Sequence, residues 1–131
     1  MTRPLVLVIE DNEQNLYLTR FLLEHNGFSV AEARDGVTGV ELAERLHPAA
    51  ILLDIQLPGM SGYEVAAQLR ETDDLARVPI IAVTSFAMVG DRERCLQAGA
   101  TDYVEKPIDS AILLEKLRQH LAGTGETTLH P

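Results

Sequence analysis

Acidic, hydroxyl and basic side chains that could together form a charged binding site follow short apolar runs at four places along the chain. A carboxylate at the end of a buried strand loses its hydration, so it needs a compensating positive charge. Clustered carboxylates attract a divalent cation, and a lysine ammonium close by would balance the remaining negative charge. The residue types alone therefore predict an acidic cation site with a lysine beside it. In chain order these residues are Glu10, Asp11, Asp54, Thr84, Ser85 and Lys106.

The sequence between these residues predicts the elements that must position them. Short apolar runs alternate with longer segments of mixed polarity, which is typical of alternating strands and helices. Polar or acidic residues open several of the helical segments, and glycine or proline follows the ends of several. We expect strands over residues 5–9, 28–33, 49–54, 79–85 and 101–105, and helices over residues 12–26, 35–47, 62–72, 90–98 and 109–121.

The pattern of these runs predicts an α/β fold with a parallel sheet and helices on both of its faces. The first, third and fourth runs are continuously apolar, as strands covered on both faces must be, whereas the second alternates and suits a sheet edge. Ligands of such sheets bind beyond the carboxyl ends of the strands, where the residues named above should meet. Residues 1–121 are expected to form one domain, and the small, polar residues 122–131 a flexible tail.

Each residue of the expected site also has an ordinary structural explanation. Glu10 and Asp11 would cap the first helix. Thr84 would be a plain strand residue, and Lys106 a solvated loop residue before Pro107. These explanations hold for each residue taken alone. They weaken because the residues fall together at the edge where this kind of fold binds ligands.

The composition limits the function classes. The 131 residues are 46% hydrophobic and include 20 acids against 11 bases, which gives a net charge of −9. This excess of acids argues against binding to nucleic acid or to anionic membranes.

The N-terminal apolar run is too short for a signal peptide or a membrane span, so we expect a cytoplasmic protein. Cys95 is the single cysteine, which excludes an internal disulfide, and no metal-ligand spacing links the histidines His25, His47, His120 and His130.

Four motifs in order resemble a response-regulator receiver domain of the CheY type: VIEDN, ILLDIQLPGMSG, IIAVTSFA and YVEKP. The resemblance spans about residues 5–121, and the stretch TSFAMVGDRERCLQAGATDYVEKPI is similar to stand-alone receivers of the DivK kind. It implies a flavodoxin-like three-layer sandwich with a five-stranded parallel sheet in the order 2-1-3-4-5. It also implies a two-component response regulator that takes a phosphoryl group from a sensor histidine kinase or a histidine phosphotransfer protein.

The resemblance implies a role for each residue of the expected site. Asp54 would accept the phosphoryl group. Asp11 and Asp54 would bind Mg²⁺ directly, and Mn²⁺ would be able to substitute. Glu10 stands where many receivers have an aspartate, and it would act mainly through metal-bound water. The backbone carbonyl of Gln56 would complete the metal ligands, and Lys106 would bind the phosphoryl group.

A switch is also implied by the resemblance. Thr84 would bind the phosphoryl group, and Tyr103 would turn inward behind it. The alternative for Tyr103 is an ordinary strand aromatic. The change would reach a partner protein through the face formed by the fourth helix, the fifth strand and the fifth helix. The Lys106–Pro107 peptide bond would be cis, and the chain would be a monomer or a weak dimer that forms on phosphorylation.

Two further expectations concern docking and the lifetime of the phosphoryl group. Phe86, Met88 and Val89 would form an apolar docking patch, or else belong to the core or a loop flank. Gln56 and Phe86 would lie beside the path by which water reaches the acyl phosphate. Because Gln56 has no ionisable group and Phe86 has no polar group, we expect slow loss of the phosphoryl group.

Three other functions are left as alternatives. A Mg²⁺-dependent hydrolase with an aspartate nucleophile would share the sheet and the metal. Haloacid-dehalogenase-like enzymes need a second acid two residues after the nucleophile, however, and this chain has Gln56 there. A dinucleotide-binding module would need G-x-G-x-x-G after the first strand, which the sequence lacks. A degenerate receiver would only bind partners, and the complete set of acceptor residues argues against it.

Overall fold

Strands and helices alternate along the described part of the chain. The computed structural model describes residues 3–85 and 90–125. Its strands are β1 (Leu5–Ile9), β2 (Ser29–Ala33), β3 (Ala50–Asp54), β4 (Ile80–Thr84) and β5 (Asp102–Glu105). Its helices are α1 (Glu13–Glu24), α2 (Gly36–Leu46), α3 (Gly62–Glu71), α4 (Asp91–Ala98) and α5 (Ser110–Gly125), with a 3₁₀ turn, η1 (Asp73–Leu75), before β4. Each strand falls within the range that the sequence predicts.

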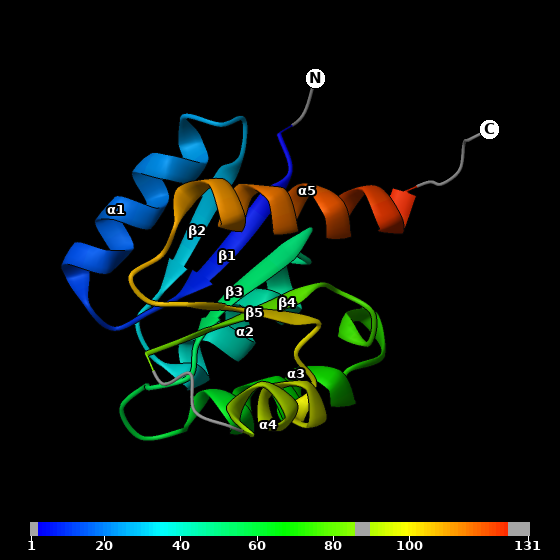
Figure 1. Cartoon of the computed structure of the whole chain (residues 1–131). Coiled ribbons are helices and arrows are strands. Elements are labelled where there is room, and N and C mark those ends of the chain that lie inside the picture. The colour runs from blue at the N-terminus through cyan, green and yellow to red at the C-terminus, as the bar shows by residue number, and fades with distance from the viewer. Residues whose placement is uncertain (1–2, 86–89, 126–131) are drawn as a thin grey trace.

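The five strands form one parallel sheet in the order β2-β1-β3-β4-β5. Helices α1 and α5 cover one face of the sheet, and α2, α3 and α4 cover the other (Figure 1). This arrangement confirms the predicted flavodoxin-like three-layer sandwich. The register pairs Asp54 with Val83 and Thr84 with Glu105, so the ends of the central strands lie side by side.

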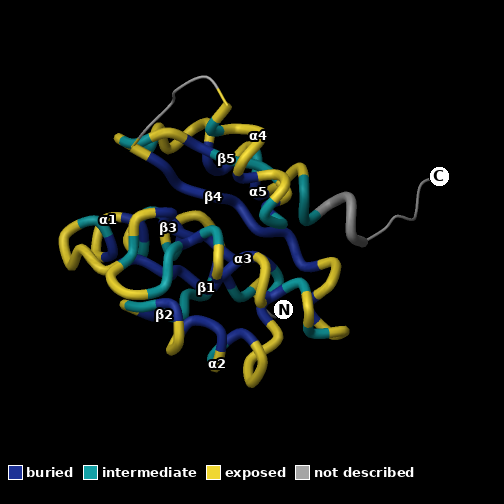
Figure 2. The backbone as a smooth tube through the Cα atoms, turned by 90° about the horizontal axis from the view of Figure 1, so that it is seen from below, coloured by how far each residue is buried: buried dark blue, intermediate teal, exposed yellow. Residues whose placement is uncertain are grey.

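Two apolar cores, one on each side of the sheet, hold the layers together. Alternate residues of β1 show the division: Leu7 and Ile9 pack with α2 and α3, whereas Val6 and Val8 pack with α1 and α5. Figure 2 shows the central strands β1, β3 and β4 buried along nearly their whole length, whereas the edge strand β2 is largely half-buried. Burying one such side chain contributes roughly 1.5–3 kcal/mol, so the strand ends that carry the site rest on a rigid support.

Helix caps fix the loops that follow β1 and β3. The side chain of Asn12 accepts a hydrogen bond from a backbone N–H in the first turn of α1. Ser61 and Glu64 form a capping box at the start of α3. Each cap of this kind contributes about 1 kcal/mol. The caps therefore fix the far ends of the two loops that follow Glu10 and Asp54.

Helix α5 differs from the sequence prediction at its C-terminal end. The expected end at Leu121 is too early, because the helix continues to Gly125. Leu113 and Leu117 are fully buried and anchor the helix on the sheet. Once a helix is anchored, each further residue adds a backbone hydrogen bond, and no proline interrupts this stretch. The predicted tail therefore begins within helix, and residues 126–131, including His130, lie outside the described residues.

Candidate functional site

The carboxyl ends of four parallel strands bring the predicted site residues together. Glu10 follows β1, Asp54 ends β3, Thr84 ends β4 and Lys106 follows β5. The backbone N–H of Lys106 donates to the carbonyl of Thr84 at 2.8 Å, which joins the ends of β4 and β5. Ser85 is exposed beside Thr84. Residues from four distant stretches of sequence thus share one edge of the sheet.

Three carboxylates form the acidic part of the site. Glu10, Asp11 and Asp54 each offer one oxygen, and these oxygens lie within 4.8 Å of one another. Glu10 and Asp54 are only 6% and 3% exposed, whereas Asp11 is exposed. Backbone N–H groups orient the two buried carboxylates: Gln56 donates to Asp54 Oδ1 at 2.9 Å, and Asn12 donates to Glu10 Oε2 at 3.1 Å. Such a set of hard oxygen donors fits a small divalent cation such as Mg²⁺.

Lys106 supplies the positive charge of the site. Its Nζ lies 3.0 Å from Asp54 Oδ2 and 3.4 Å from Glu10 Oε1. Burial acts to lower the pKa of Lys106, but the hydrogen bond to Asp54 and the charges of Asp54 and Glu10 outweigh it, so the pKa is raised. The ammonium therefore stays protonated and partly balances the two buried carboxylates.

The carboxyl group of Glu10 titrates far from its ordinary range. Burial, followed by a hydrogen bond with Asp54, raises the pKa of Glu10 from 4.5 to about 7. The backbone N–H of Asn12 and the charge of Lys106 act in the opposite direction without restoring the ordinary value. Without a metal ion, the carboxyl group of Glu10 is therefore partly protonated at neutral pH.

The two proposed switch residues occupy neighbouring strands. Thr84 is only 2% exposed at the end of β4. Tyr103 is half-buried on β5, and cations from both flanking helices lie over its ring, with Arg92 Cζ at 5.9 Å and Lys116 Nζ at 5.3 Å from the ring centroid. The Lys106–Pro107 peptide bond after β5 is cis.

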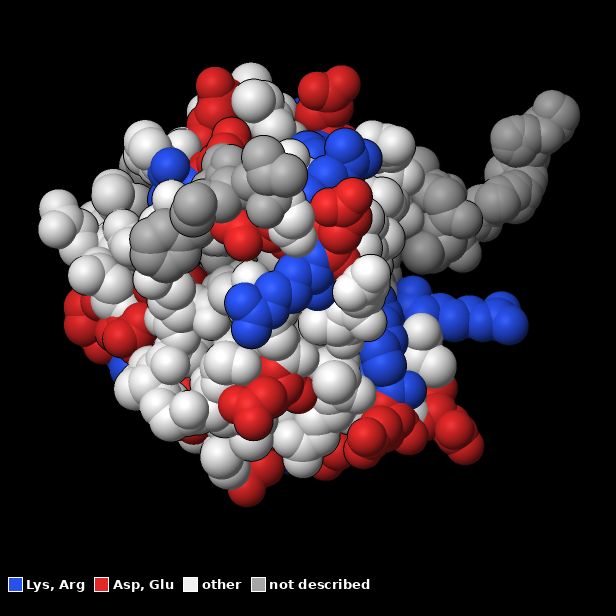
Figure 3. All heavy atoms as spheres, turned by 60° about the horizontal axis from the view of Figure 1, so that its bottom comes forward, with Lys and Arg blue, Asp and Glu red and all other residues white. Residues whose placement is uncertain are grey.

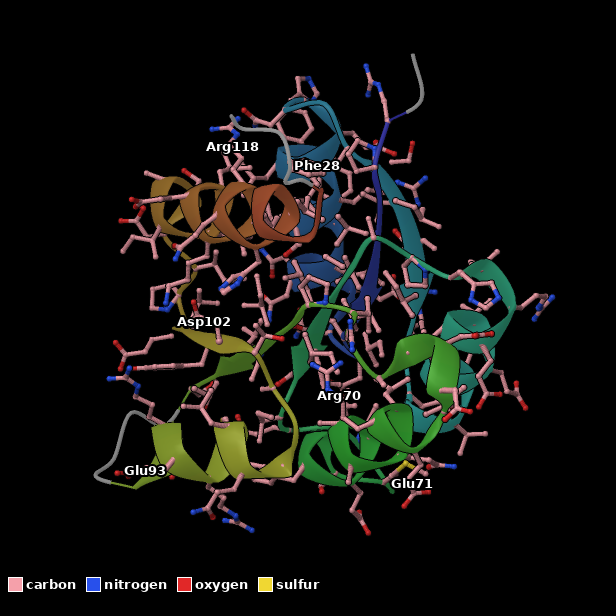
Figure 4. The ribbon with its side chains drawn as sticks, turned by 90° about the vertical axis from the view of Figure 1, so that its right-hand side faces the viewer. Phe28, Arg70, Glu71, Glu93, Asp102 and Arg118 are labelled. Carbon is pink, nitrogen blue, oxygen red and sulfur yellow. The ribbon has the colours of Figure 1, made fainter. Side chains whose placement is uncertain are left out.

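Sequence reasoning missed a polar cluster beside Tyr103. Asp102 accepts a hydrogen bond from Lys116 at 2.8 Å and lies 3.0 Å from His120 Nε2, both on α5. Burial acts to raise the pKa of Asp102, but the hydrogen bonds from His120 and Lys116 outweigh it, so the pKa is lowered. Figure 4 shows Asp102 on β5 below α5. The i, i+4 spacing of Lys116 and His120 was the signal in the sequence, because it places both on one side of a helix.

Gly62 is a second feature that the sequence prediction did not single out. A Cβ on Gly62 would lie 2.5 Å from Ile55 Cα and 2.6 Å from the carbonyl oxygen of Asp54. The start of α3 therefore packs directly against the backbone that carries Asp54. A glycine in the first turn of a helix was the available signal, since such a residue weakens a helix unless close packing needs it.

Several sequence expectations fall outside the described residues. These are the docking patch of Phe86, Met88 and Val89 and the effect of Phe86 on phosphoryl lifetime. The side chain of Gln56, the other residue expected to influence lifetime, is exposed.

The surface charge is mixed on the face that Figure 3 shows. Acidic and basic side chains are interspersed there, and the described part of this face has no continuous basic area of the kind that binds a phosphate backbone. Within the described ranges, no helix combines the length and the apolar character needed to cross a bilayer.

The fold and the acidic edge together define a flavodoxin-like α/β domain with a cluster of carboxylates suited to a divalent cation at the carboxyl ends of its strands. Comparison with known families agrees, because the family model for the response regulator receiver domain matches residues 6–118. The chain belongs to this family, the receiver domains of two-component response regulators. It is 43% identical over 116 residues to the polar-differentiation response regulator DivK of Brucella ovis, which covers 88% of this chain and 94% of that protein. DivK of Brucella anthropi matches with the same identity and coverage.

Solved structures give the same result. The receiver domain of a sensor histidine kinase from Pseudomonas aeruginosa PAO1 is 39% identical, with a TM-score of 0.86 over 92% of this chain and 98% of that chain. That structure holds a magnesium ion coordinated in its active site cleft. A receiver domain from Syntrophus aciditrophicus is 26% identical, with a TM-score of 0.87 over 98% of this chain and 97% of that chain.

Proposed function

We propose that the chain is a phosphoryl-accepting response regulator and that Asp54 is its acceptor. The observation that carries the proposal is the setting of the Asp54 carboxylate at the end of the central strand β3. It lies among the oxygens of Glu10 and Asp11, within 4.8 Å, and contacts Lys106 Nζ at 3.0 Å. The donor is a phosphohistidine on a sensor histidine kinase or a histidine phosphotransfer protein, the sources from which receiver domains take the group.

The proposed transfer moves the phosphoryl group between two proteins. A carboxylate oxygen of Asp54 forms a bond to phosphorus while the bond between phosphorus and the donor imidazole nitrogen breaks. Negative charge is spread over the phosphoryl oxygens in a loose transition state, so positioning and electrostatics do most of the work. The backbone N–H of Gln56 fixes one Asp54 oxygen. Lys106, close to the other, pairs with the incoming phosphoryl oxygens, since an ammonium binds phosphate as well as carboxylate.

A metal ion completes this site in the proposal. Glu10, Asp11 and Asp54 would hold Mg²⁺ together with the backbone carbonyl of Gln56, because these are the oxygen ligands that Mg²⁺ prefers. Mn²⁺ accepts similar ligands and would substitute. When bound, the ion supplies positive charge beside the phosphoryl oxygens. The magnesium ion in the similar Pseudomonas aeruginosa structure supports this assignment.

The signal would leave through the face formed by α4, β5 and α5. Thr84 bonds the phosphoryl group in the phosphorylated state, Tyr103 follows it inward, and a partner protein binds the altered face. Such a switch works only through contacts that differ between the two states, and the Thr84 hydroxyl is one of them. In this proposal the chain is a monomer or a weak phosphorylation-dependent dimer, and Gln56 and Phe86 slow the loss of the phosphoryl group.

The test uses the purified chain with Mg²⁺ and radiolabelled acetyl phosphate. The parent protein should become labelled, and Asp54→Asn should not. Asp74→Asn, which changes an exposed aspartate of η1 in the same way, is the matched control and should label like the parent. Label retained on Asp54→Asn would overturn the assignment of the acceptor.

The same reaction separates the receiver from its rivals. A receiver should take up about one phosphoryl group per chain and release phosphate slowly. Steady release of phosphate from small phosphoesters would instead favour the hydrolase with an aspartate nucleophile. Absence of label on a folded parent protein would favour a degenerate receiver that only binds partners.

A further inference from the structure

A small cavity lies directly behind the acidic site. Its volume is about 10 Å³, and its polar lining consists of Glu10, Asp54 and Thr19, with apolar side chains completing the wall. Roughly 10–15 Å³ is enough for one water molecule, provided that two or more polar groups face it. The volume of the cavity is at the lower limit of this range, and three polar residues line it.

Thr19 of α1 is the unexpected member of this lining. It is one of the few polar residues of the interior, with only 8% of its surface exposed. Within the described residues, no hydrogen bond involves its hydroxyl group. A threonine in a helix commonly bonds the carbonyl one turn earlier, and Thr19 does not. A buried hydroxyl without a partner costs about 1–3 kcal/mol, so a hydrogen-bond partner within the cavity that Thr19 lines would be stabilising.

A wider groove adjoins the cavity. It has a volume of about 210 Å³ and lies between α1 and the chain that links β5 to α5. Glu10, Thr19 and Ile108 line both the groove and the cavity. The groove therefore lies beside the cavity, on the side of α1.

The Glu10 carboxylate would be held more firmly by a hydrogen-bond donor in the cavity. A glutamate has one more rotatable bond than an aspartate, so more contacts are needed to hold its carboxylate in one place. The backbone N–H of Asn12 holds Oε2 at 3.1 Å, and Lys106 lies 3.4 Å from Oε1. A carboxylate offers about four acceptor positions, so room is left for a donor from the cavity.

We propose that one buried water molecule bridges the Thr19 hydroxyl and the Glu10 carboxylate, and that Thr19 is thereby a positioning residue for the metal site. The water donates one hydrogen bond to Glu10 and a second bond joins it to the hydroxyl. The carboxylate of Glu10 is then held in one orientation, with its remaining acceptor positions directed toward the metal site. The role of Thr19 in metal binding rests on the proposed function, whereas the water bridge itself does not.

The first test is a high-resolution crystal structure of the full chain without metal, as the parent and as Thr19→Val and Thr19→Ser. Valine has the shape of threonine without its hydroxyl, so Thr19→Val keeps the packing. An ordered water within hydrogen-bond distance of both Thr19 Oγ1 and Glu10 is expected in the parent. The water is also expected in Thr19→Ser and should be lost in Thr19→Val. A hydroxyl bonded to the Asn15 carbonyl, with no water at Glu10, would overturn the proposal.

The second test measures the Mg²⁺ dissociation constant by NMR titration. Loss of an indirect metal-site partner weakens metal binding by roughly tenfold or more, so Thr19→Val should show that loss and Thr19→Ser should not. In a Glu10→Ala background the same substitution should have no effect, because Thr19 acts through Glu10. Parent affinity in Thr19→Val would overturn the positioning role. If the parent binds no Mg²⁺, the proposed function and the positioning role both fail, and the crystal structures still decide on the water.

Discussion

The ammonium of Lys106 lies 3.0 Å from Oδ2 of Asp54, although the two residues are 52 positions apart in the chain. Asp54 ends β3 and Lys106 follows β5, with β4 between them in the sheet. The lysine therefore reaches across the end of β4 to the acid. This reach places a cation on the oxygen that is opposite the one fixed by the backbone N–H of Gln56.

Replacing Lys106 should slow phosphorylation more than it disturbs folding. In Lys106→Met the phosphoryl oxygens lose a preorganised cation, and loss of one such donor slows a reaction by roughly a hundredfold. The measurement is the initial rate of labelling by acetyl phosphate at saturating Mg²⁺. Lys116→Met is the matched control. Lys116 of α5 pairs with Asp102 of β5 and not with the acidic site, so its replacement should leave the labelling rate unchanged. Equal rates for the parent and Lys106→Met would remove Lys106 from the chemistry.

Adding a single methyl group at Gly62 should displace the backbone that carries Asp54. A Cβ at Gly62 would lie 2.5 Å from Ile55 Cα, so the backbone after Asp54 must shift to admit it. We expect Gly62→Ala to lower the free energy of unfolding by about 1–3 kcal/mol and to slow labelling of Asp54. Gly27→Ala is the control, since Gly27 has a φ of +93° and no atom within 4 Å of its Cβ position. It should reduce stability through backbone strain alone and leave the labelling rate unchanged.

The sequence was sufficient to predict the sheet and the site edge because both depend on patterns within single segments. Runs such as Ile51–Leu53 report burial on both faces of a strand, and parallel strands must end at one edge. The acids, Thr84 and Lys106 could therefore be brought together before any distance was known. The end of α5 was predicted less well, because small residues after Leu121 neither favour nor forbid another turn of helix.

Contacts between distant segments were beyond the sequence for a physical reason. The hydrogen bonds of Arg70 connect α3 with η1, the start of β4 and the chain before β5, and no periodicity within one segment encodes them. The sequence also did not single out Thr19. It occupies a buried position of an amphipathic helix, where an apolar residue is usual, so the helical pattern predicts its burial but no role for its hydroxyl group. A role for the hydroxyl group follows only from the cavity that Thr19 lines.

Arg70 should be one of the strongest single contributors to stability outside the apolar cores. Its guanidinium donates to the carbonyls of Gly99, Leu75 and Val78 at 2.7–2.9 Å, and to Thr101 Oγ1 at 3.1 Å. We expect Arg70→Met to lower the free energy of unfolding in urea by about 2–4 kcal/mol, because the partners are left without a donor.

A surface arginine provides the comparison for Arg70. Figure 4 shows Arg70 of α3 pointing into the protein, whereas Arg118 extends outward from α5. Arg118→Met should change the free energy of unfolding by no more than about 0.5 kcal/mol. If both substitutions have small effects, water replaces the arginine donors easily, and Arg70 does not hold α3 to the start of β4.

Removing the Thr84 hydroxyl should separate phosphorylation from signalling. In Thr84→Ala the acceptor Asp54 is intact, so labelling should continue at a rate close to that of the parent. The phosphoryl group then lacks the contact that favours the active state, and a ligand shifts an equilibrium only through such differences. The measurement is the NMR shift change of Tyr103 and of α4 on addition of beryllofluoride. A parent-like change in Thr84→Ala would place the switch elsewhere, and Thr84→Ser is the variant that should retain it.

The stability of the metal-free protein should depend on the protonation of Glu10. Its pKa is about 7 in the folded protein against 4.5 ordinarily. Between these two pH values the folded protein keeps a proton that the unfolded chain has released. The stability contributed by protonated Glu10 is therefore fully present below about pH 4.5 and is lost as the pH rises through about 7.

Urea unfolding in EDTA over this pH range tests the dependence, with Glu10→Gln as the variant that cannot titrate. The free energy of unfolding of the parent, relative to Glu10→Gln, should fall by on the order of 1–3 kcal/mol between about pH 5 and pH 8. Glu41→Gln, on the exposed side of α2, should follow the parent at every pH. Adding Mg²⁺ should reduce the fall, because a nearby dication stabilises the ionised carboxylates. Identical pH profiles for the parent and Glu10→Gln would mean that Glu10 titrates in its ordinary range, and that the backbone N–H of Asn12 and the charge of Lys106 offset its burial.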